Sequence, residues 1–198
     1  IPFCDRLCWF CGCNTKQTLK YAPVQAYLKR LYKEIEMVAA KLPHRLQVVS
    51  LHLGGGSPTL LQADDFAKLR DVLRTHFDFT DDAEISIEID PSDVTPDQIK
   101  GMVDFGLTRA SIGVQDFSDV VQKAINRPQS FEVTRDVVNA LRAHGIQSIN
   151  LDVLYGLPYQ TTERLMDTVA KTAFLQPDRI ALFGYAHVPW MKTHQKMI

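Results

Sequence analysis

Residues 84–114 read EISIEIDPSDVTPDQIKGMVDFGLTRASIGV and contain one complete strand–helix–strand unit. Apolar and polar side chains alternate strictly over residues 84–89, as they do in a strand. Thr95 and Pro96 are suited to begin a helix, and Gly106 is suited to end it. Residues 109–114 then predict a second strand. A helix between two strands favours a parallel sheet built from βα units.

The same pattern continues on both sides of this unit. Further strands are predicted over 48–53, 148–154 and 180–185, and further helices over 24–42, 64–76, 132–144 and 162–175. No Gly/Ser-rich linker separates them, so residues 1–198 are predicted to form a single domain. Residues 1–3 match the tip of a strand before the first helix. We therefore expect an α/β fold, a partial (β/α)6 TIM-like barrel that is truncated at both ends.

Composition excludes several classes of protein. The 198 residues are 45% hydrophobic, and 22 basic side chains nearly balance 23 acidic ones, which gives a net charge of −1. This balance argues against a strongly basic surface that binds nucleic acid. No run of about 18 apolar residues predicts a transmembrane helix. We expect neither nucleic acid nor a membrane as a partner.

All the cysteines lie in one short segment, at positions 4, 8, 11 and 13. A disulfide framework would distribute cysteines over the elements that it joins. A structural zinc site typically uses two separated pairs, and a redox pair would leave two cysteines unexplained. The spacing C-x3-C-x2-C-x-C favours an iron–sulfur cluster. A zinc-binding interaction module remains the alternative of another class, and zinc without iron or acid-labile sulfide would indicate it.

Polar, small or metal-binding residues follow each predicted strand. In (β/α) barrels, functional residues gather at the carboxyl ends of the strands. The residues at these ends are Cys4–Cys13, Gly54–Thr59, Glu88, Asp90, Gln115, Asp116, Asp152 and 185–187. Taken singly, a glycine run can be a tight turn and a carboxylate can be a helix cap or a buried structural group. Their convergence predicts one binding site. His52, His144 and His194 are predicted to be structural or solvated.

The loop C-x3-C-x2-C after a first barrel strand resembles that of the radical S-adenosylmethionine (SAM) superfamily. The resemblance implies that Cys4, Cys8 and Cys11 hold three irons of a 4Fe–4S cluster. The amino and carboxylate groups of SAM would chelate the fourth iron. Electron transfer from the cluster would then yield methionine and a 5′-deoxyadenosyl radical, which abstracts a hydrogen atom. Phe10 also fits the superfamily pattern.

A closer resemblance covers essentially the whole chain. It is carried by residues 1–14 (IPFCDRLCWFCGCN), 51–59 (LHLGGGSPT), 84–91, 111–117, 126–127, 152–158 and 185–187. These segments resemble the family of oxygen-independent coproporphyrinogen III oxidases. Those oxidoreductases decarboxylate two propionates of coproporphyrinogen III to vinyls, giving protoporphyrinogen IX in heme biosynthesis. The resemblance implies the same substrate and an unidentified electron donor. We also expect a monomer, and a redox-exposed cluster argues for oxygen sensitivity and a cytoplasmic location.

The resemblance also implies roles for individual residues. Gly55 and Glu88 would contact the cluster-bound SAM. A second SAM site would be lined by Phe10, Gly56, Ser57, Gln115, Arg127, Asp152 and Ala186. Position 57 commonly holds Thr in the family, and the Ser here keeps the hydroxyl. Cys13 matches a family cysteine that is not a cluster ligand. The nearest alternative is the heme-chaperone-like branch of the superfamily, which shares the cluster loop, typically lacks the Cys-Gly-Cys sequence and would bind heme.

Overall fold

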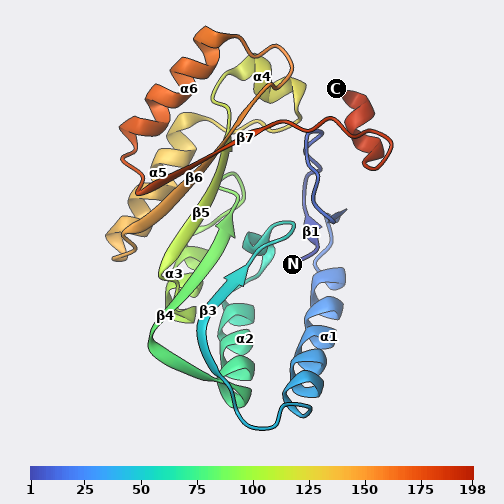
Figure 1. Cartoon of the computed structure of the whole chain (residues 1–198), viewed down its shortest axis with the longest axis vertical. Coiled ribbons are helices and arrows are strands. Elements are labelled where there is room, and N and C mark those ends of the chain that lie inside the picture. The colour runs from blue at the N-terminus through green and yellow to red at the C-terminus, as the bar shows by residue number, and fades with distance from the viewer.

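The computed structural model describes residues 1–198, and its centre is a curled sheet of five parallel strands. In spatial order these are β3 (Gln47–Leu53), β4 (Asp78–Ile89), β5 (Arg109–Gln115), β6 (Ser148–Tyr155) and β7 (Arg179–Gly184). Each strand lies beside its neighbour in the chain, which is the order that successive βα units generate. The sheet curves as an open half-barrel (Figure 1). The predicted α/β class and partial barrel are confirmed.

The predicted helices are present within a few residues of their expected ends. They are α1 (Ala22–Ala39), α2 (Ala63–His76), α3 (Pro96–Phe105), α5 (Phe131–Ala143) and α6 (Thr162–Phe174). A further helix, α4 (Asp119–Ala124), was not predicted because six residues are too few to show a helical period. No helix combines the length and apolar character needed to cross a membrane. In Figure 1, α5 and α6 lie on one side of the sheet, and the cysteine-bearing segment lies on the other.

Local signals in the sequence explain where α3 begins and ends. Gln98 N donates to Thr95 Oγ1 at 3.3 Å, and Thr95 N donates to Gln98 Oε1 at 2.8 Å, which together form a capping box. Gly106 ends the helix at a φ of 111°, in the left-handed region that glycine tolerates. β4 begins at Asp78, ahead of the alternation over 84–89 that predicted it. Asp81 and Asp82 interrupt the apolar alternation, although the backbone is already paired with β3 at Asp78 and Phe79.

The two faces of the sheet differ in chemistry, as β5 illustrates. Ala110, Ile112 and Val114 are buried in the hydrophobic core, which joins the sheet to its helices. The intervening residues Ser111 and Gly113 face the other way and are only partly buried. Because side chains alternate along a strand, the inner face of the half-barrel is polar. This face can carry a site.

The segment before the cysteines is hydrogen-bonded to the glycine run that follows β3. β1 (Phe3–Cys4) pairs in parallel with β2 (Lys16–Gln17), a short strand on the far side of the cysteine loop. Ile1 N donates to Gly54 O at 2.7 Å, and Gly56 N donates back to Ile1 O at 2.8 Å. The expected strand before the cysteines is therefore present. It extends the half-barrel beside the glycine run that follows β3, outside the five-stranded sheet.

Candidate active site

A cavity of about 210 Å³ lies between the cysteine loop and the carboxyl ends of β3 to β6. Eleven of the twelve predicted site residues line it: Cys4, Cys8, Phe10, Cys11, Gly55, Gly56, Ser57, Glu88, Gln115, Arg127 and Asp152. Ala186 does not. Asp90, Ser111 and Thr15 also contribute to the wall. The convergence expected from the strand ends is thus present in three dimensions.

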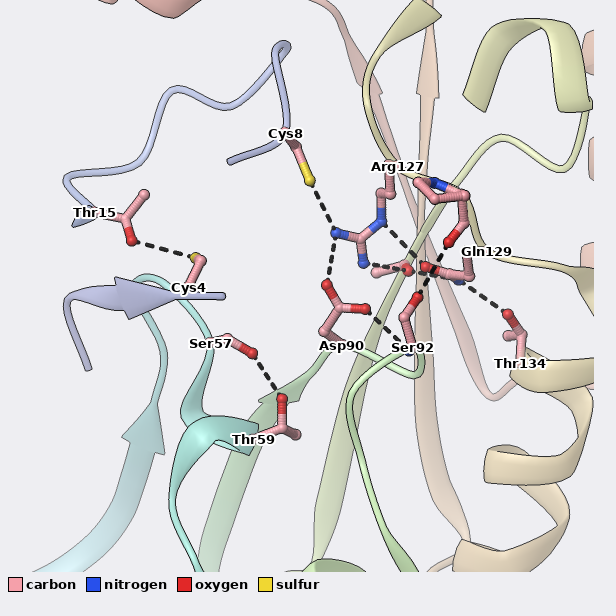
Figure 2. Close-up of polar contacts among 12 residues, drawn as sticks. Cys4, Cys8, Thr15, Ser57, Thr59, Asp90, Ser92, Arg127, Gln129 and Thr134 are labelled. Atoms are coloured by element: carbon pink, nitrogen blue, oxygen red, sulfur yellow. Dashed lines mark hydrogen bonds and ion pairs between the residues drawn. The ribbon is translucent and has the colours of Figure 1, made fainter. Parts of the chain in front are cut away.

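The cysteines that line the cavity are all free thiols. Thr15 Oγ1 lies 3.2 Å from Cys4 Sγ, and Arg127 Nη1 lies 3.5 Å from Cys8 Sγ (Figure 2). Burial raises the pKa of the Cys4 and Cys8 thiols above the ordinary value. Nowhere do three His, Cys, Asp or Glu side chains converge as ligands of a single metal ion. Thiolates are the ligands of iron–sulfur clusters, so a cavity lined by free thiols offers the donor atoms that such a cluster requires.

Cys13 lies beside Cys11 and also lines the cavity. Its backbone nitrogen lies 3.3 Å from Cys11 Sγ, to which it donates a hydrogen bond. The hydrogen bond from the Cys11 thiol lowers the pKa of Cys13 to about 7, and the same contact raises the pKa of Cys11. Cys13 is the only exposed cysteine.

Each glycine of the run after β3 meets a separate geometric requirement. Gly55 has a φ of 112°, which disfavours any side chain. A Cβ on Gly56 would lie 2.5 Å from Phe3 O, because β1 passes directly against it. A Cβ on Gly54 would lie 2.7 Å from His52 Nε2 and 2.8 Å from Glu88 Cδ. Because these glycines carry no Cβ, β1 and the Glu88 side chain can pack against the run. Its backbone also stays open toward the cavity.

Glu88 is held at the end of β4 by two neighbours. Gly55 N donates to Glu88 Oε2 at 3.0 Å, and His52 Nε2 lies 3.4 Å from Glu88 Oε1. His52 Nδ1 lies 2.6 Å from Ser86 Oγ, which fixes the ring. The Glu88 side chain is 42% exposed, so its carboxylate can still accept a hydrogen bond from a hydroxyl in the cavity. The prediction that His52 is structural or solvated missed this contact with a predicted site residue.

Arg127 lies under the cysteine loop with its guanidinium engaged on all sides (Figure 2). Nη1 lies 3.0 Å from Asp90 Oδ2, Nη2 donates to Gly113 O at 3.0 Å, and Nε donates to Gln129 Oε1 at 3.1 Å. The residue is only 8% exposed. Arg127 is therefore not a solvated surface arginine but is paired with a carboxylate inside the site. Asp90 is the partner that sequence reasoning did not identify.

Gln115 ends β5 in the left-handed region, with a φ of 66°. This conformation is uncommon for a residue with a side chain and coincides with a register shift between Gly113 and Gln115 in the pairing with β6. A Cβ on Gly113 would lie 3.0 Å from both Gln115 Nε2 and Arg127 Nη2. The Gln115 amide is therefore folded back over Gly113 and lies near the guanidinium.

Asp152 projects from β6 into the cavity as a hydrogen-bonded, partly buried carboxylate. It accepts from Asn150 Nδ2 at 2.7 Å and from Ser111 Oγ at 3.3 Å. Burial raises its pKa above the usual value despite these bonds. By contrast, Asp116 is fully buried, does not line the cavity, and accepts from Ser118 N and Gln160 Nε2. Asp116 has a structural role at this strand end.

The remaining predicted residues occupy different surroundings. Ser57 Oγ lies 2.7 Å from Thr59 Oγ1, so the hydroxyl is turned away from solvent (Figure 2). Phe10 packs on a small apolar cluster that includes Ile125. Ala186 follows β7, and its carbonyl accepts from Gln195 Nε2 at 3.2 Å, outside the cavity wall. Gln195 was not predicted, because most of the chain separates it from the cysteine loop and no local pattern marks it.

Comparison with known proteins identifies the family. The sequence pattern of the radical SAM superfamily matches residues 1–171. An anaerobic coproporphyrinogen III oxidase of Cereibacter sphaeroides is 48% identical over all 198 residues, which cover 44% of its length. The structure of the coproporphyrinogen III oxidase of Escherichia coli, a radical SAM enzyme, has a TM-score of 0.96 and 42% identity, covering this chain entirely and 45% of that one.

A more distant structure, the Elp3 protein of Methanocaldococcus infernus, has a TM-score of 0.59 at 16% identity. It covers 87% of this chain and 45% of that one, and it shares the fold. This chain spans less than half the length of the curated relatives that it matches. A family pattern that extends over 171 residues, on a half-barrel with four cysteines lining its cavity, is decisive. The chain belongs to the radical SAM superfamily.

Proposed function

We propose that this chain carries the radical SAM site for oxidative decarboxylation of two propionates of coproporphyrinogen III, which gives protoporphyrinogen IX in heme biosynthesis. The observation that carries the proposal is the cavity, because eleven residues predicted from the resemblance line one space. The names of the relatives with 48% and 42% identity support the choice of substrate. We also propose that residues 1–198 act as a single barrel domain, since one core joins α1, α2, α3 and α5 to the sheet.

The family implies a 4Fe–4S cluster and SAM, and the free thiols of the cavity suit such a cluster. We propose Cys4, Cys8 and Cys11 as its three protein ligands. Together the two groups supply a carbon-centred radical that removes a hydrogen atom from an unactivated carbon. Each propionate radical would then lose CO₂ and pass one electron to a one-electron acceptor, which leaves the vinyl group. The walls of the cavity exclude water while the substrate radical exists.

Glu88 is the proposed acceptor for hydroxyl groups of SAM, and Gly55 offers backbone without a Cβ beside it. Arg127 places a positive charge next to Cys8, where thiolate and cluster charge accumulates. A second SAM site is proposed along the inner wall. Its residues are Phe10, Gly56, Ser57, Gln115, Arg127, Asp152 and Ala186, of which Ala186 would contribute from just beyond the cavity.

We further propose an electron donor that reduces the cluster, action as a monomer, and a cytoplasmic location. The clustering of four free thiols in one loop supports a reducing environment. The near balance of 22 basic and 23 acidic residues supports a small-molecule substrate over nucleic acid.

Anaerobic turnover tests the proposal directly. The complete product of the gene that encodes this chain is supplied with reconstituted cluster, coproporphyrinogen III, SAM and a reductant, and products are read by mass spectrometry. We expect stepwise loss of two carboxyl groups together with 5′-deoxyadenosine, and no loss when SAM is omitted. Formation of 5′-deoxyadenosine without decarboxylation would show that coproporphyrinogen III is not the substrate. If protein with an intact cluster forms neither product, that result would favour the heme-binding alternative.

A further inference from the structure

The last residues of the chain hold the cysteine loop through its backbone. A turn of 3-10 helix, η2 (Thr193–Met197), follows β7 and lies on the same side of the sheet as the cysteine-bearing segment (Figure 1). Lys192 Nζ donates to Cys13 O at 2.9 Å, and His194 Nε2 donates to Cys11 O at 2.7 Å. Gln195 Nε2 donates to Phe10 O at 2.9 Å. Three side chains of one turn thus hold three carbonyls around the third cluster cysteine.

Gln195 is the centre of this arrangement. It is fully buried, with an exposed fraction of 0%. Besides its bond to Phe10 O, its Nε2 donates to Ala186 O at 3.2 Å, and its Oε1 accepts from Val188 N at 2.5 Å. The amide therefore uses both donors and its acceptor. It joins the cysteine loop to the segment that leaves β7.

Apart from the packing of Phe10 and a bond from Cys11 N to Cys8 O at 3.1 Å, the second half of the cysteine loop is held mainly by this turn. No strand or helix lies between Cys4 and Lys16. The first half is tied to the end of α4, since Trp9 N donates to Ile125 O at 2.9 Å and Asn126 Nδ2 donates to Leu7 O at 3.0 Å. No residue outside the turn donates a hydrogen bond to the carbonyls of residues 10, 11 or 13.

We propose that Gln195 is a positioning residue of the cluster site. It holds the backbone at Phe10 and so sets where the Cys11 thiolate lies relative to those of Cys4 and Cys8. With only three protein ligands, a cluster is sensitive to displacement of any one of them, because outer hydrogen bonds orient the ligands. This inference rests on the radical SAM site proposed above. It adds that the C-terminal turn is part of that site.

Replacement of Gln195 by Leu tests the inference, with Lys196→Gln as the matched control on an exposed position of the same turn. Each protein is reconstituted anaerobically, and its fold is compared by circular dichroism. We expect Gln195→Leu to release iron to a chelator about 10- to 100-fold faster than the wild type, in line with loss of an outer-shell partner. We also expect a changed electron paramagnetic resonance spectrum of the reduced cluster on addition of SAM. The control should match the wild type in both.

A second variant decides the case if Gln195→Leu fails to fold. His194→Phe keeps a ring and removes only the donor to Cys11 O. It should accelerate iron release and alter the same spectrum to a smaller extent. A folded variant of either kind that matches the wild type in iron release and spectrum overturns the inference. Failure of the proposed function is distinguishable, because the wild type itself would then form no cluster or no deoxyadenosine.

Discussion

Arg127 Nη1 lies 3.0 Å from Asp90 Oδ2 and 3.5 Å from Cys8 Sγ, so one guanidinium nitrogen joins the carboxylate that directly follows β4 to a cysteine of the loop. The side chains of Arg127 and Asp90 are only 10% and 22% exposed. A buried pair of this kind is costly to break, because the partner that remains is charged and unsolvated. The pair therefore fixes the floor of the cavity at the point where the cysteine loop contacts the sheet.

Replacing Arg127 with Met should lower the free energy of unfolding by about 3–5 kcal/mol, since Asp90 is left buried without its partner. Urea denaturation of the two proteins at equal cluster loading measures the difference. Arg135→Met is the matched control, because Arg135 pairs with Asp136 at the surface, with side chains 42% and 65% exposed. A surface pair is expected to contribute about 1 kcal/mol or less.

Adding Asp90→Asn to Arg127→Met should recover part of the lost stability, because the unpaired charge is then removed. If Arg127→Met is no less stable than Arg135→Met, the pair does not hold the floor of the cavity.

The cysteine assignments predict a clear division among the four thiols. Changing Cys4, Cys8 or Cys11 to Ala should abolish both the visible absorption of the cluster and turnover, because a cluster bound by two protein ligands is not retained. Cys13→Ala should leave the cluster assembled, since the resemblance gives the three ligand positions to the other cysteines although Cys13 also lines the cavity. Absorption spectra after anaerobic reconstitution check each variant. Loss of the cluster in Cys13→Ala would show that the ligand set is wrong.

Much of the fold was predictable because its signals are local. The capping box at Thr95 and the left-handed Gly106 bound α3 where the sequence indicated. The alternation of residues 84–89 located the end of β4 and hence Glu88. The pairing of β1 with β2 was not predictable, because two-residue strands carry no periodicity. For the same reason α4 was missed, although Ile125 and Asn126 at its end help to hold the cysteine loop.

The site was predictable to the extent that strand ends converge in a barrel. Which side chains touch one another was not. His52 and Glu88 are neighbours because His52 pairs with Ser86 across two strands, and this register is set by the fold. Arg127 and Asp90 meet between a loop and a strand end. Ala186 lies just outside the cavity because its carbonyl faces Gln195, a contact between segments that no local pattern encodes.

Glu88→Gln is expected to weaken SAM binding about 10- to 100-fold while the cluster persists, because hydrogen bonds to a charged acceptor are stronger than those to an amide. Equilibrium dialysis of labelled SAM against the reconstituted protein measures the affinity, and visible absorption monitors the cluster. Glu84→Gln is the control, since Glu84 lies on the same strand, pairs with Arg109 and does not line the cavity. Unchanged affinity in Glu88→Gln would remove Glu88 from the site.

His52 should act on SAM only through Glu88. Its Nδ1 is fixed by Ser86 and its Nε2 faces the Glu88 carboxylate, so His52→Ala frees that carboxylate to rotate. We expect a loss of SAM affinity of about tenfold or less. In a Glu88→Gln background, His52→Ala should add almost nothing, because the two residues act as a unit. Additive losses in the double-mutant cycle would mean that His52 contacts SAM independently.

Asp93 gives the protein a pH-dependent stability. Burial, the nearby charge of Asp90 and a hydrogen bond with Asp5 raise the pKa of Asp93 to about 7. In the unfolded chain the pKa of an aspartate is about 4. Between about pH 4 and pH 7, Asp93 therefore keeps a proton in the folded state that it releases in the unfolded state. Stability should therefore fall as pH rises through this window and level off above it. Asp93→Asn cannot ionise and should remove this part of the decline.

Urea midpoints from pH 5 to 8, at equal cluster loading, measure the effect. Asp82→Asn is the control, because it neutralises an exposed carboxylate on β4. That variant should keep the slope of the wild type, whereas Asp93→Asn should be flatter and relatively more stable at the alkaline end. If the Asp93→Asn profile runs parallel to the wild type across the whole range, then Asp93 is ionised throughout and carries no proton into the folded state at neutral pH.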